Sequence, residues 1–310
     1  SADSQQIEGG REDDGMNRSN DSCPNLSMRL ETASVLVHKA VGAVKRNRIP
    51  RRNLIWLELT GCSGNTISLL DGFHPDFKSM ATQMVNLLYS NSLMAAEGEV
   101  AMERLFGAIG GDYILAAEGA AATKDNGLYN IIGRWRGRPV TAYEAIQKFG
   151  EQAACVVAVG TCASDGGISA ARPNPAECVG IQSLLDRKVI KLPGCPCHPD
   201  WFLGTLAYFL LFGEPELDER QRPLMFYSTL IHDLCPRRPY FDRGIFASRL
   251  GEKGCMFKLG CRGPVTRADC PIRKWNGRVN WPIGDSSPCI GCAMFGFPDA
   301  MEPFISYDTT

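Results

Sequence analysis

The sequence has little net charge and no long apolar run. Its 33 basic and 34 acidic residues give a formal net charge of −1 at pH 7, which argues against binding to nucleic acid or to an anionic membrane surface. Residues 1–30 are polar and lack the apolar segment of a secretory signal peptide, and no stretch near residue 310 is long enough to cross a bilayer. We therefore expect a cytoplasmic protein that would associate with a membrane only peripherally, through partners.

The sequence also lacks the features of a disulfide-stabilised protein. Its cysteines number 13, so they cannot all be paired with one another. A chain of 310 residues that is 44% hydrophobic can bury an adequate core without covalent cross-links. Clustered thiols in a reducing compartment usually bind metal. The cysteines therefore predict metal sites rather than a disulfide framework.

Many of the candidate metal ligands are concentrated between residues 231 and 298. They are His232, Cys235, Cys255, Cys261, Cys270, Cys289 and Cys292. The Cys289-x2-Cys292 pair fits either tetrahedral zinc or two corners of an iron–sulfur cluster, and by itself favours zinc. Zinc sites usually place a second close pair within about twenty residues of the first, however, and the other spacings here are irregular. The uneven spacing and the Cys270-Pro271 pair favour an iron–sulfur cage, and zinc stays open as the rival.

Residues 53–211 alternate between apolar runs that suit strands and periodic stretches that suit helices. The expected strands are 53–59, 113–118, 155–159 and 188–192. The expected helices are 66–71, 78–105, 141–149 and 201–211. Residues 34–45 fit either a short amphipathic helix or a strand. The alternation predicts a doubly wound α/β domain with a parallel sheet, whose functional loops follow the carboxyl ends of the strands.

Composition divides the chain into three parts. Residues 1–48 begin with a polar stretch that cannot bury enough surface to fold alone, and we expect a flexible N-terminal extension there. Residues 49–213 form the expected α/β domain, and the Gly- and Pro-containing segment after it has the composition of a linker. Residues 214–310 form the expected loop-rich domain that contains most of the clustered cysteines.

The order of these motifs resembles the small subunit of nickel–iron hydrogenases, of the soluble uptake (group 2-like) type. An IHD-x-C motif begins at Ile231, LGC-x-GP-x-T begins at Leu259 and PCIGC begins at Pro288, and the resemblance covers nearly everything after residue 50. It implies a flavodoxin-like domain followed by a small loop-rich iron–sulfur cluster domain. It also implies an electron-relay subunit that serves the oxidation of H2 to protons and passes electrons through three clusters to an acceptor, such as a quinone or a redox protein.

The resemblance assigns ten ligands to three clusters. The proximal set is Cys62, Cys162 and Cys195, with Asn65 in the place of the fourth ligand. The medial set is Cys270, Cys289 and Cys292, with Pro282 where a fourth thiolate would stand. The distal set is His232, Cys235, Cys255 and Cys261.

These ligand sets predict the cluster types. We expect [3Fe–4S] at the medial site, and [3Fe–4S] or a [4Fe–4S] with a non-thiolate corner at the proximal site. The distal site, with four ligands, would hold [4Fe–4S] or [3Fe–4S]. A site with fewer anionic thiolates is less negative, which raises its potential and suits a high-potential acceptor such as a quinone. Gly64 and Gly167 stand where oxygen-tolerant, six-cysteine members of the family carry two further cysteines, so that tolerance mechanism is absent.

The resemblance also implies partners and leaves alternatives. An obligate large subunit would carry the nickel–iron centre, the two chains would form a heterodimer that assembles into a higher oligomer, and no residue of this chain would carry out bond chemistry. The main alternative is the small subunit of a regulatory, H2-sensing hydrogenase. Further alternatives are a related subunit of respiratory complex I or of the enzymes that reduce a deazaflavin, and a zinc-stabilised α/β protein.

A few residues beside the motifs have no settled role. Glu118 either supports the proximal site or is an ordinary loop carboxylate. Cys197 and His198 either bind a metal of their own or only support the site or are inert. Arg237 and Arg238 could form a docking patch for an electron acceptor, although exposed arginines are common. The cysteines left without an assigned role are Cys23, Cys155, Cys178 and Cys197.

Overall fold

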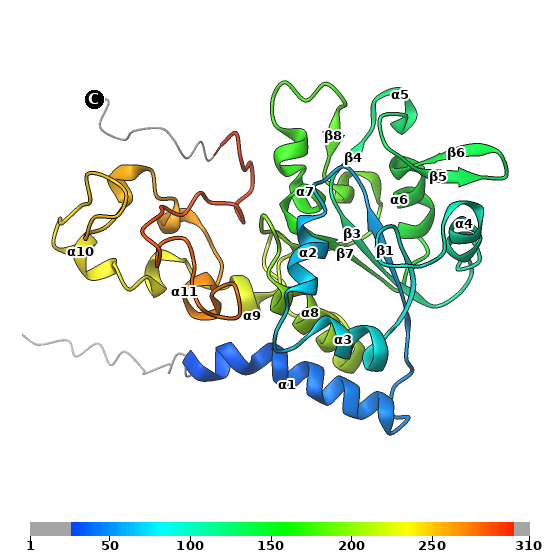
Figure 1. Cartoon of the computed structure of the whole chain (residues 1–310), viewed down its shortest axis with the longest axis horizontal. Helices are drawn as coiled ribbons and strands as arrows, with labels where there is room; N and C mark the ends of the chain where they lie inside the picture. The colour runs from blue at the N-terminus through cyan, green and yellow to red at the C-terminus, as the bar shows by residue number, and fades with distance from the viewer. Residues whose placement is uncertain (1–25, 301–310) are drawn as a thin grey trace, which may run out of the picture.

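The computed structural model describes residues 26–300, and its centre is a five-stranded parallel sheet (Figure 1). The strand order is β2-β1-β3-β7-β9. The strands are β1 (Asn53–Glu58), β2 (Asn86–Ser90), β3 (Tyr113–Glu118), β7 (Cys155–Val159) and β9 (Ile190–Leu192). Every neighbouring pair is parallel. This arrangement confirms the predicted doubly wound α/β class.

Helices cover both faces of the sheet, because its strands are apolar on both sides. In β1, Leu54 and Trp56 pack into one hydrophobic cluster while Ile55 and Leu57 pack into the other. The first cluster includes α1 (Leu26–Lys45) and α8 (Pro199–Phe212). The second includes α4 (Gly98–Phe106) and α6 (Ala142–Gly150). The sheet is therefore the middle layer of three.

The predicted helix over residues 78–105 is wrong. This stretch contains α3 (Phe77–Ser79), η1 (Met80–Met84), strand β2 and then α4. The segment NLLYS pairs in parallel with β1 as the edge strand of the sheet. A short apolar run does not distinguish a buried helix from a strand by its pattern, and strand pairing decides the outcome here. The methionines Met80, Met84 and Met102 are buried in the core.

The N-terminal segment is ordered over much of the range for which a flexible extension was expected. Residues 26–45 form α1, so the helix alternative for residues 34–45 is the correct one. Ala33, Val37 and Ala40 are buried and pack in the same hydrophobic cluster as α8. The expected extension over 1–48 is therefore wrong for these residues, because the helix buries an apolar stripe on the folded body.

The part after α8 is built from short turns of helix connected by loops. They are α9 (Leu224–Tyr227), η4 (His232–Leu234), α10 (Arg238–Asp242), η5 (Phe257–Leu259), η6 (Gly263–Val265) and α11 (Cys270–Arg273). Ile231, Met256 and Trp281 nevertheless belong to the same hydrophobic cluster as Trp56 and Trp201. The loop-rich part is thus packed directly against one face of the α/β layers.

The remaining elements are short and connect the strands and helices of these layers. They are α2 (Gly64–Leu70), β4 (Ala121–Ala122), α5 (Lys124–Gly127), β5 (Ile131–Trp135), β6 (Arg138–Thr141), α7 (Gly160–Asp165), η2 (Gly167–Ala170), β8 (Cys178–Val179) and η3 (Ile181–Leu184). Across residues 26–300, no helix is both long enough and apolar enough to cross a membrane.

Candidate iron–sulfur cluster sites

The three proximal cysteines follow three strands at the carboxyl edge of the sheet. Cys62 follows β1, Cys162 lies in α7 directly after β7, and Cys195 follows β9. Burial raises the pKa of the Cys195 thiol to about 12, and the neighbouring Cys292, Cys162 and Cys62 contribute to the rise. The thiols are therefore close enough to repel one another as thiolates. A cationic metal centre would reverse this effect, since a bound metal deprotonates its thiol ligands.

Asn65 occupies the expected fourth position, but its side chain is already bonded to the protein. It is 9% exposed, its Nδ2 donates to Glu118 Oε1 over 3.1 Å, and its Oδ1 accepts from the Cys197 N–H over 2.7 Å. Gly160 lies against it, and a Cβ on that glycine would come within 2.5 Å of Asn65 Oδ1. The amide is thus held in a polar network and is poorly suited to bind iron.

Glu118 anchors the turn that carries Cys62. This carboxylate is 1% exposed and accepts hydrogen bonds from the backbone N–H groups of Asn65 and Thr66, at 2.7 and 2.9 Å. It also accepts from Asn65 Nδ2 and from Thr66 Oγ1. An ionised carboxylate with several donors strongly favours this turn geometry. Of the two roles left open for Glu118, these contacts favour support of the proximal site over that of an ordinary loop carboxylate.

A cavity of about 480 Å³ lies at the medial site. Cys270, Cys289 and Cys292 line it, and so does Pro282, at the position expected to lack a thiolate. Burial raises the pKa of Cys289 to about 12, with Cys292 adding to the effect, whereas the Gly291 N–H lowers it by bonding to the sulfur. Cys195 of the proximal set lines the same cavity, and thiols that converge on one cavity and repel one another fit an iron–sulfur site.

The distal cysteines lie together in the loop-rich part, where Cys261 also contacts Cys289 of the medial set. Burial raises the pKa of Cys235, and the neighbouring Cys261 and Cys255 contribute. The Arg237 N–H donates to Cys235 Sγ over 3.4 Å, and Cys255 and Cys261 also receive backbone N–H donors. Such donors stabilise thiolates and cluster sulfurs.

His232 lies beside this group. Its ring packs edge-on against Phe241 with centroids 4.6 Å apart. Burial, assisted by Arg238, lowers the pKa of this histidine, which keeps the imidazole in the neutral form that a metal ligand requires.

The proximal and medial groups are in direct contact. The backbone N–H of Cys195 hydrogen-bonds to the Cys292 sulfur, and Cys195 also lines the medial cavity. Next to Cys162, the hydroxyl of Thr161 donates to the Cys292 carbonyl and accepts from the Gly194 N–H at 2.9 Å. Thr161 had no motif signal in the sequence, because a buried threonine after a strand is common.

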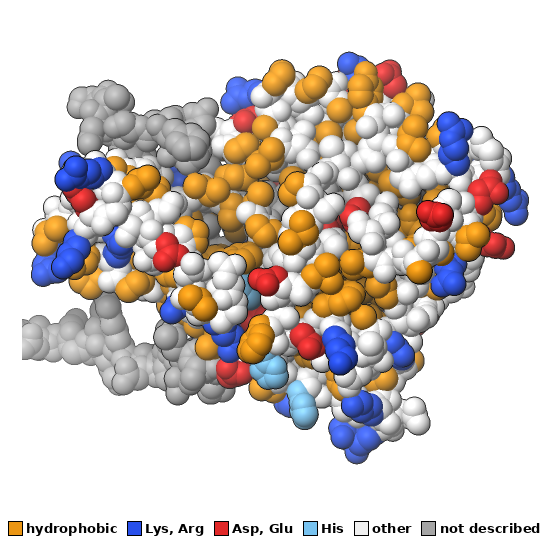
Figure 2. All heavy atoms as spheres, in the orientation of Figure 1, with side chains coloured by type: hydrophobic (Ala, Val, Ile, Leu, Met, Phe, Trp, Pro, Cys, Tyr) orange, Lys and Arg blue, Asp and Glu red, His pale blue; other side chains and the backbone are white. Residues whose placement is uncertain are grey.

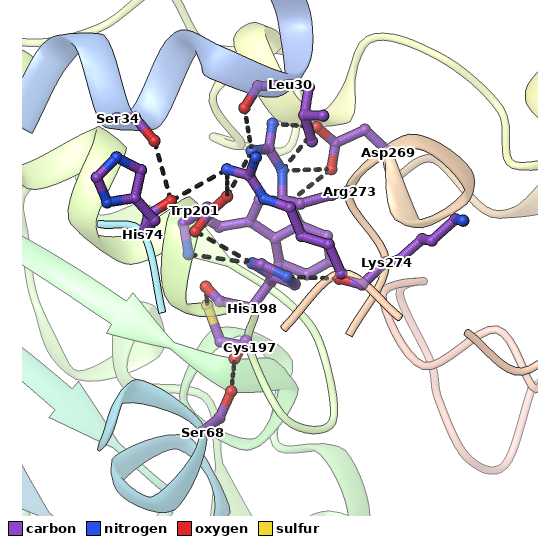
Figure 3. A network of polar contacts seen from close by, with 12 residues as sticks. Leu30, Ser34, Ser68, His74, Cys197, His198, Trp201, Asp269, Arg273 and Lys274 are labelled. Carbon is purple, nitrogen blue, oxygen red and sulfur yellow. Dashed lines mark hydrogen bonds and ion pairs between the residues drawn. The ribbon is translucent and has the colours of Figure 1, made fainter. Parts of the chain in front are cut away.

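A buried polar network lies beside the short helix α11, which begins at Cys270 (Figure 3). Arg273, on the same short helix, is 0% exposed and lies between Asp269 and Asp200, at 2.6 and 2.8 Å. It also donates to the carbonyls of Arg29 and Leu30 in α1. The indole Nε1–H of Trp201 completes the network by donating to Asp269 Oδ1 over 2.7 Å. The sequence did not reveal this network, because its members are far apart along the chain.

His198 lies at the edge of this network. Its Nδ1 accepts from the Asp200 N–H and its Nε2–H donates to the Lys274 carbonyl. Burial, with Arg273 nearby, holds the pKa of His198 well below its usual range, so the ring is neutral with the proton on Nε2. His198 thus caps α8 and is bonded to the backbone after Cys270.

The two arginines considered for a docking patch are both bonded to other parts of the protein. Arg237 donates to the carbonyls of Glu252 and Gly254 and to Ser286 Oγ, so it holds the distal loops together and is not available for docking. Arg238 is bonded to Asp233 and Asp242. Cys155 is buried in β7.

The other cysteines without an assigned role are found in three situations. Cys178 is buried, and burial raises the pKa of its thiol. The neighbouring Cys162 adds a smaller rise. Cys197 is buried behind Asn65. Cys23 lies outside the described residues. All the cysteines of residues 26–300 are free thiols, and no three His, Cys, Asp or Glu side chains in that range converge on a position for a single metal ion.

The fold and the thiol groups define an iron–sulfur electron-transfer protein built on a flavodoxin-like sheet, and the comparisons with known proteins identify its family. The family that describes the C-terminal part of the NiFe/NiFeSe hydrogenase small subunit matches residues 227–305. The NADH ubiquinone oxidoreductase 20 Kd subunit family matches residues 62–209. The chain is 37% identical to the periplasmic [NiFe] hydrogenase small subunit of Solidesulfovibrio fructosivorans, over 91% of this chain and 90% of that protein.

Further relatives agree. The uptake hydrogenase small subunit of Azotobacter vinelandii is 38% identical over 81% of this chain and 71% of its own length. A structure of the [NiFeSe] hydrogenase from Desulfovibrio vulgaris Hildenborough superposes with a TM-score of 0.78 at 35% identity, covering 83% of this chain and 98% of that one. An actinobacterial-type NiFe hydrogenase from Ralstonia eutropha H16 gives 0.77 at 30% identity, covering 83% of each. The chain belongs to the small subunits of nickel–iron hydrogenases.

Proposed function

We propose that this chain is the electron-relay subunit of an uptake hydrogenase, with three iron–sulfur clusters bound by the ten assigned ligands. When bound, such clusters supply one-electron redox centres. The observation that carries the proposal is the contact between the proximal and medial groups, in which the Cys195 N–H bonds to the Cys292 sulfur. The same residue thereby offers a thiol to one site and a hydrogen bond to the next. We also propose that residues 49–213 hold the proximal site and that residues 214–310 hold the other two.

The side chains at the two incomplete sites support three-iron clusters. Asn65 has its amide oxygen and nitrogen bonded to Cys197 and Glu118, so the proximal site would keep three thiolate ligands. Pro282 lines the medial cavity and has no donor atom to offer a metal. We therefore propose [3Fe–4S] at both sites, and [4Fe–4S] or [3Fe–4S] at the distal site, where His232 and three thiols are present. Raised potentials at these sites would suit a quinone as the acceptor.

The large subunit would bind beside the proximal thiols. Ile67, Leu70, Phe73 and Ile168, which we call the proximal apolar patch, are 63, 47, 80 and 58% exposed. They flank Cys62 and Cys162 in the sequence, and Figure 2 shows hydrophobic side chains gathered over α2 and α7. Exposed apolar patches of this kind mark protein–protein interfaces. We further propose the cytoplasm as the compartment and a higher oligomer of heterodimers as the assembly.

The test is the iron and acid-labile sulfide content of the anaerobically purified heterodimer, together with the EPR spin count of the oxidised form. Three clusters on this chain require about nine to ten irons and about twelve sulfides, and the nickel–iron centre of the large subunit adds one iron. Each oxidised [3Fe–4S] cluster adds one spin. About one zinc and no sulfide would contradict the proposal. Rapid turnover of H2 with a quinone analogue would favour the uptake type over the regulatory, H2-sensing alternative.

A further inference from the structure

His198 joins the loop of the proximal site to the loop of the medial site. It follows Cys195 by three residues and is 6% exposed. Its Nε2–H donates over 2.7 Å to the carbonyl of Lys274, which lies four residues beyond Cys270. Its Nδ1 accepts from the Asp200 N–H over 3.0 Å and thereby caps α8. Figure 3 shows the bond from the His198 ring to Lys274, and with the Asp200 contact both ring nitrogens are in use.

The imidazole also packs against Trp275. The two ring centroids are 4.8 Å apart, with the planes inclined at 62°. Trp275 lines the medial cavity together with Cys270, and its side chain hydrogen-bonds to the Cys270 sulfur. The imidazole, the indole and the thiol therefore form a continuous series of contacts. This series runs from the loop of Cys195 to one ligand of the medial set.

We propose that His198 is a positioning residue for the medial cluster, because it holds Lys274 and Trp275 so that the indole N–H stays directed at Cys270. The inference rests on the proposed function, since it requires a cluster bound by Cys270. Hydrogen bonds to cluster sulfurs are one of the determinants of a cluster's potential. An N–H donor stabilises the more negative, reduced state, so it raises the midpoint potential of the medial site.

Two substitutions separate the roles of the two ring nitrogens. In His198→Asn, the short amide keeps an acceptor for the Asp200 N–H and remains a good helix cap, but it does not reach the Lys274 carbonyl. In His198→Gln, the longer amide carries an N–H to the position of Nε2, so it keeps the link to Lys274. The first variant therefore tests the positioning role while α8 stays capped. The second is its matched control.

A third variant tests the contact between Trp275 and the Cys270 sulfur. Trp275→Phe removes the indole N–H and keeps an aromatic ring against His198. The double variant His198→Asn with Trp275→Phe tests whether both residues act through the same hydrogen bond, because coupled residues give non-additive effects.

The measurement is an EPR-monitored redox titration of the purified heterodimer. We expect His198→Asn to lower the midpoint potential of the medial signal and to change its line shape, while the proximal and distal signals stay at their wild-type potentials. His198→Gln should titrate like the wild type. Trp275→Phe should shift the medial potential in the same direction as His198→Asn, and the double variant should show no further shift.

Other results would overturn the inference. An unshifted medial potential in both His198→Asn and Trp275→Phe, at full iron content, would do so. Equal shifts in His198→Asn and His198→Gln would also do so, because they would indicate a general loss of packing at residue 198. If His198→Asn loses the medial signal, a shifted Trp275→Phe supports the inference and an unshifted one contradicts it. A wild-type heterodimer without a medial signal would instead contradict the proposed function.

Discussion

At the residue scale, Asn65 shows how one side chain can close a ligand position that the fold still presents. The turn after β1 keeps Cys62, and Glu118 holds that turn through the backbone N–H groups of residues 65 and 66. Because Asn65 bonds to Glu118 and to the Cys197 N–H, its amide stabilises the loop without offering a thiolate. The chemistry of the proximal site should therefore change when residue 65 changes, while the scaffold stays the same.

Asn65→Cys should restore a fourth thiolate at the proximal site. We expect about one additional iron per chain, loss of one [3Fe–4S] spin from the oxidised EPR spectrum, and a lower proximal potential, because an added anionic ligand stabilises the oxidised state. Iron analysis and an EPR-monitored titration check this. Cys155→Ala, which removes a buried thiol that we assign to no cluster, is the control and should leave both measurements unchanged. An unchanged iron content in Asn65→Cys would contradict our assignment of residue 65 to the proximal site.

Glu118→Gln should destabilise the turn that carries Cys62. The substitution replaces one carboxylate oxygen with an amide NH2, which faces donors that are buried and lose their acceptor. Leaving such groups unsatisfied costs about 1–3 kcal/mol. Thermal unfolding of the heterodimer should show a lower Tm and earlier loss of proximal iron. Glu99→Gln, at an exposed position in the first turn of α4, is the matched control, and an equal Tm for both variants would contradict this role.

At the element scale, the strands were predictable where burial alone decides them. β1, β3 and β7 are apolar runs buried on both faces, and the expected ranges 53–59, 113–118 and 155–159 agree with the structure. β2 was missed because NLLYS is short and lies within a Met-, Leu- and Ala-rich stretch. Its strand conformation comes from pairing with β1, which is a contact that local sequence does not encode.

The short helix α11 is stabilised by packing rather than by its own hydrogen bonds. It has four residues, and Arg273 connects it to α8 through Asp200 and to α1 through two backbone carbonyls. Because a helix of this length is not stable alone, this guanidinium should determine where Cys270 lies.

Arg273→Met should therefore cost about 3–5 kcal/mol, because it leaves two buried carboxylates without their cation. We expect a large drop in Tm, together with loss of the medial EPR signal before the distal one. Adding Asp269→Asn to Arg273→Met should recover part of the Tm, since one unpaired charge is then removed. The exposed pair of Arg138 and Glu144 provides the control, and Arg138→Gln should leave the Tm unchanged. A Tm for Arg273→Met equal to that of Arg138→Gln would contradict the role of this residue.

At the scale of the whole molecule, the grouping of ligands could be predicted from the order of motifs, whereas the connections between the groups could not. Cys195 and Cys292 are far apart in the sequence, and only the packing of the loop-rich part against the sheet brings the N–H of one to the sulfur of the other. The same holds for Thr161 and for the Arg273 network, which involve common residue types without a spacing signal. Sequence motifs thus indicate which side chains carry the chemistry, and the fold determines how the sites are joined.

The proximal apolar patch is the surface at which we propose that the large subunit binds. Ile67→Asp should place a charge in the interface and prevent assembly with the large subunit, while iron binding by this chain stays intact because the side chain points to solvent. Leu250→Asp is the control, since Leu250 is equally exposed, at 64%, but lies in the distal part of the chain. Co-purification with a tagged large subunit, followed by size-exclusion chromatography, checks the prediction. Assembly of Ile67→Asp at the wild-type yield would show that the large subunit binds elsewhere, and loss of assembly in both variants would show that neither face is specific.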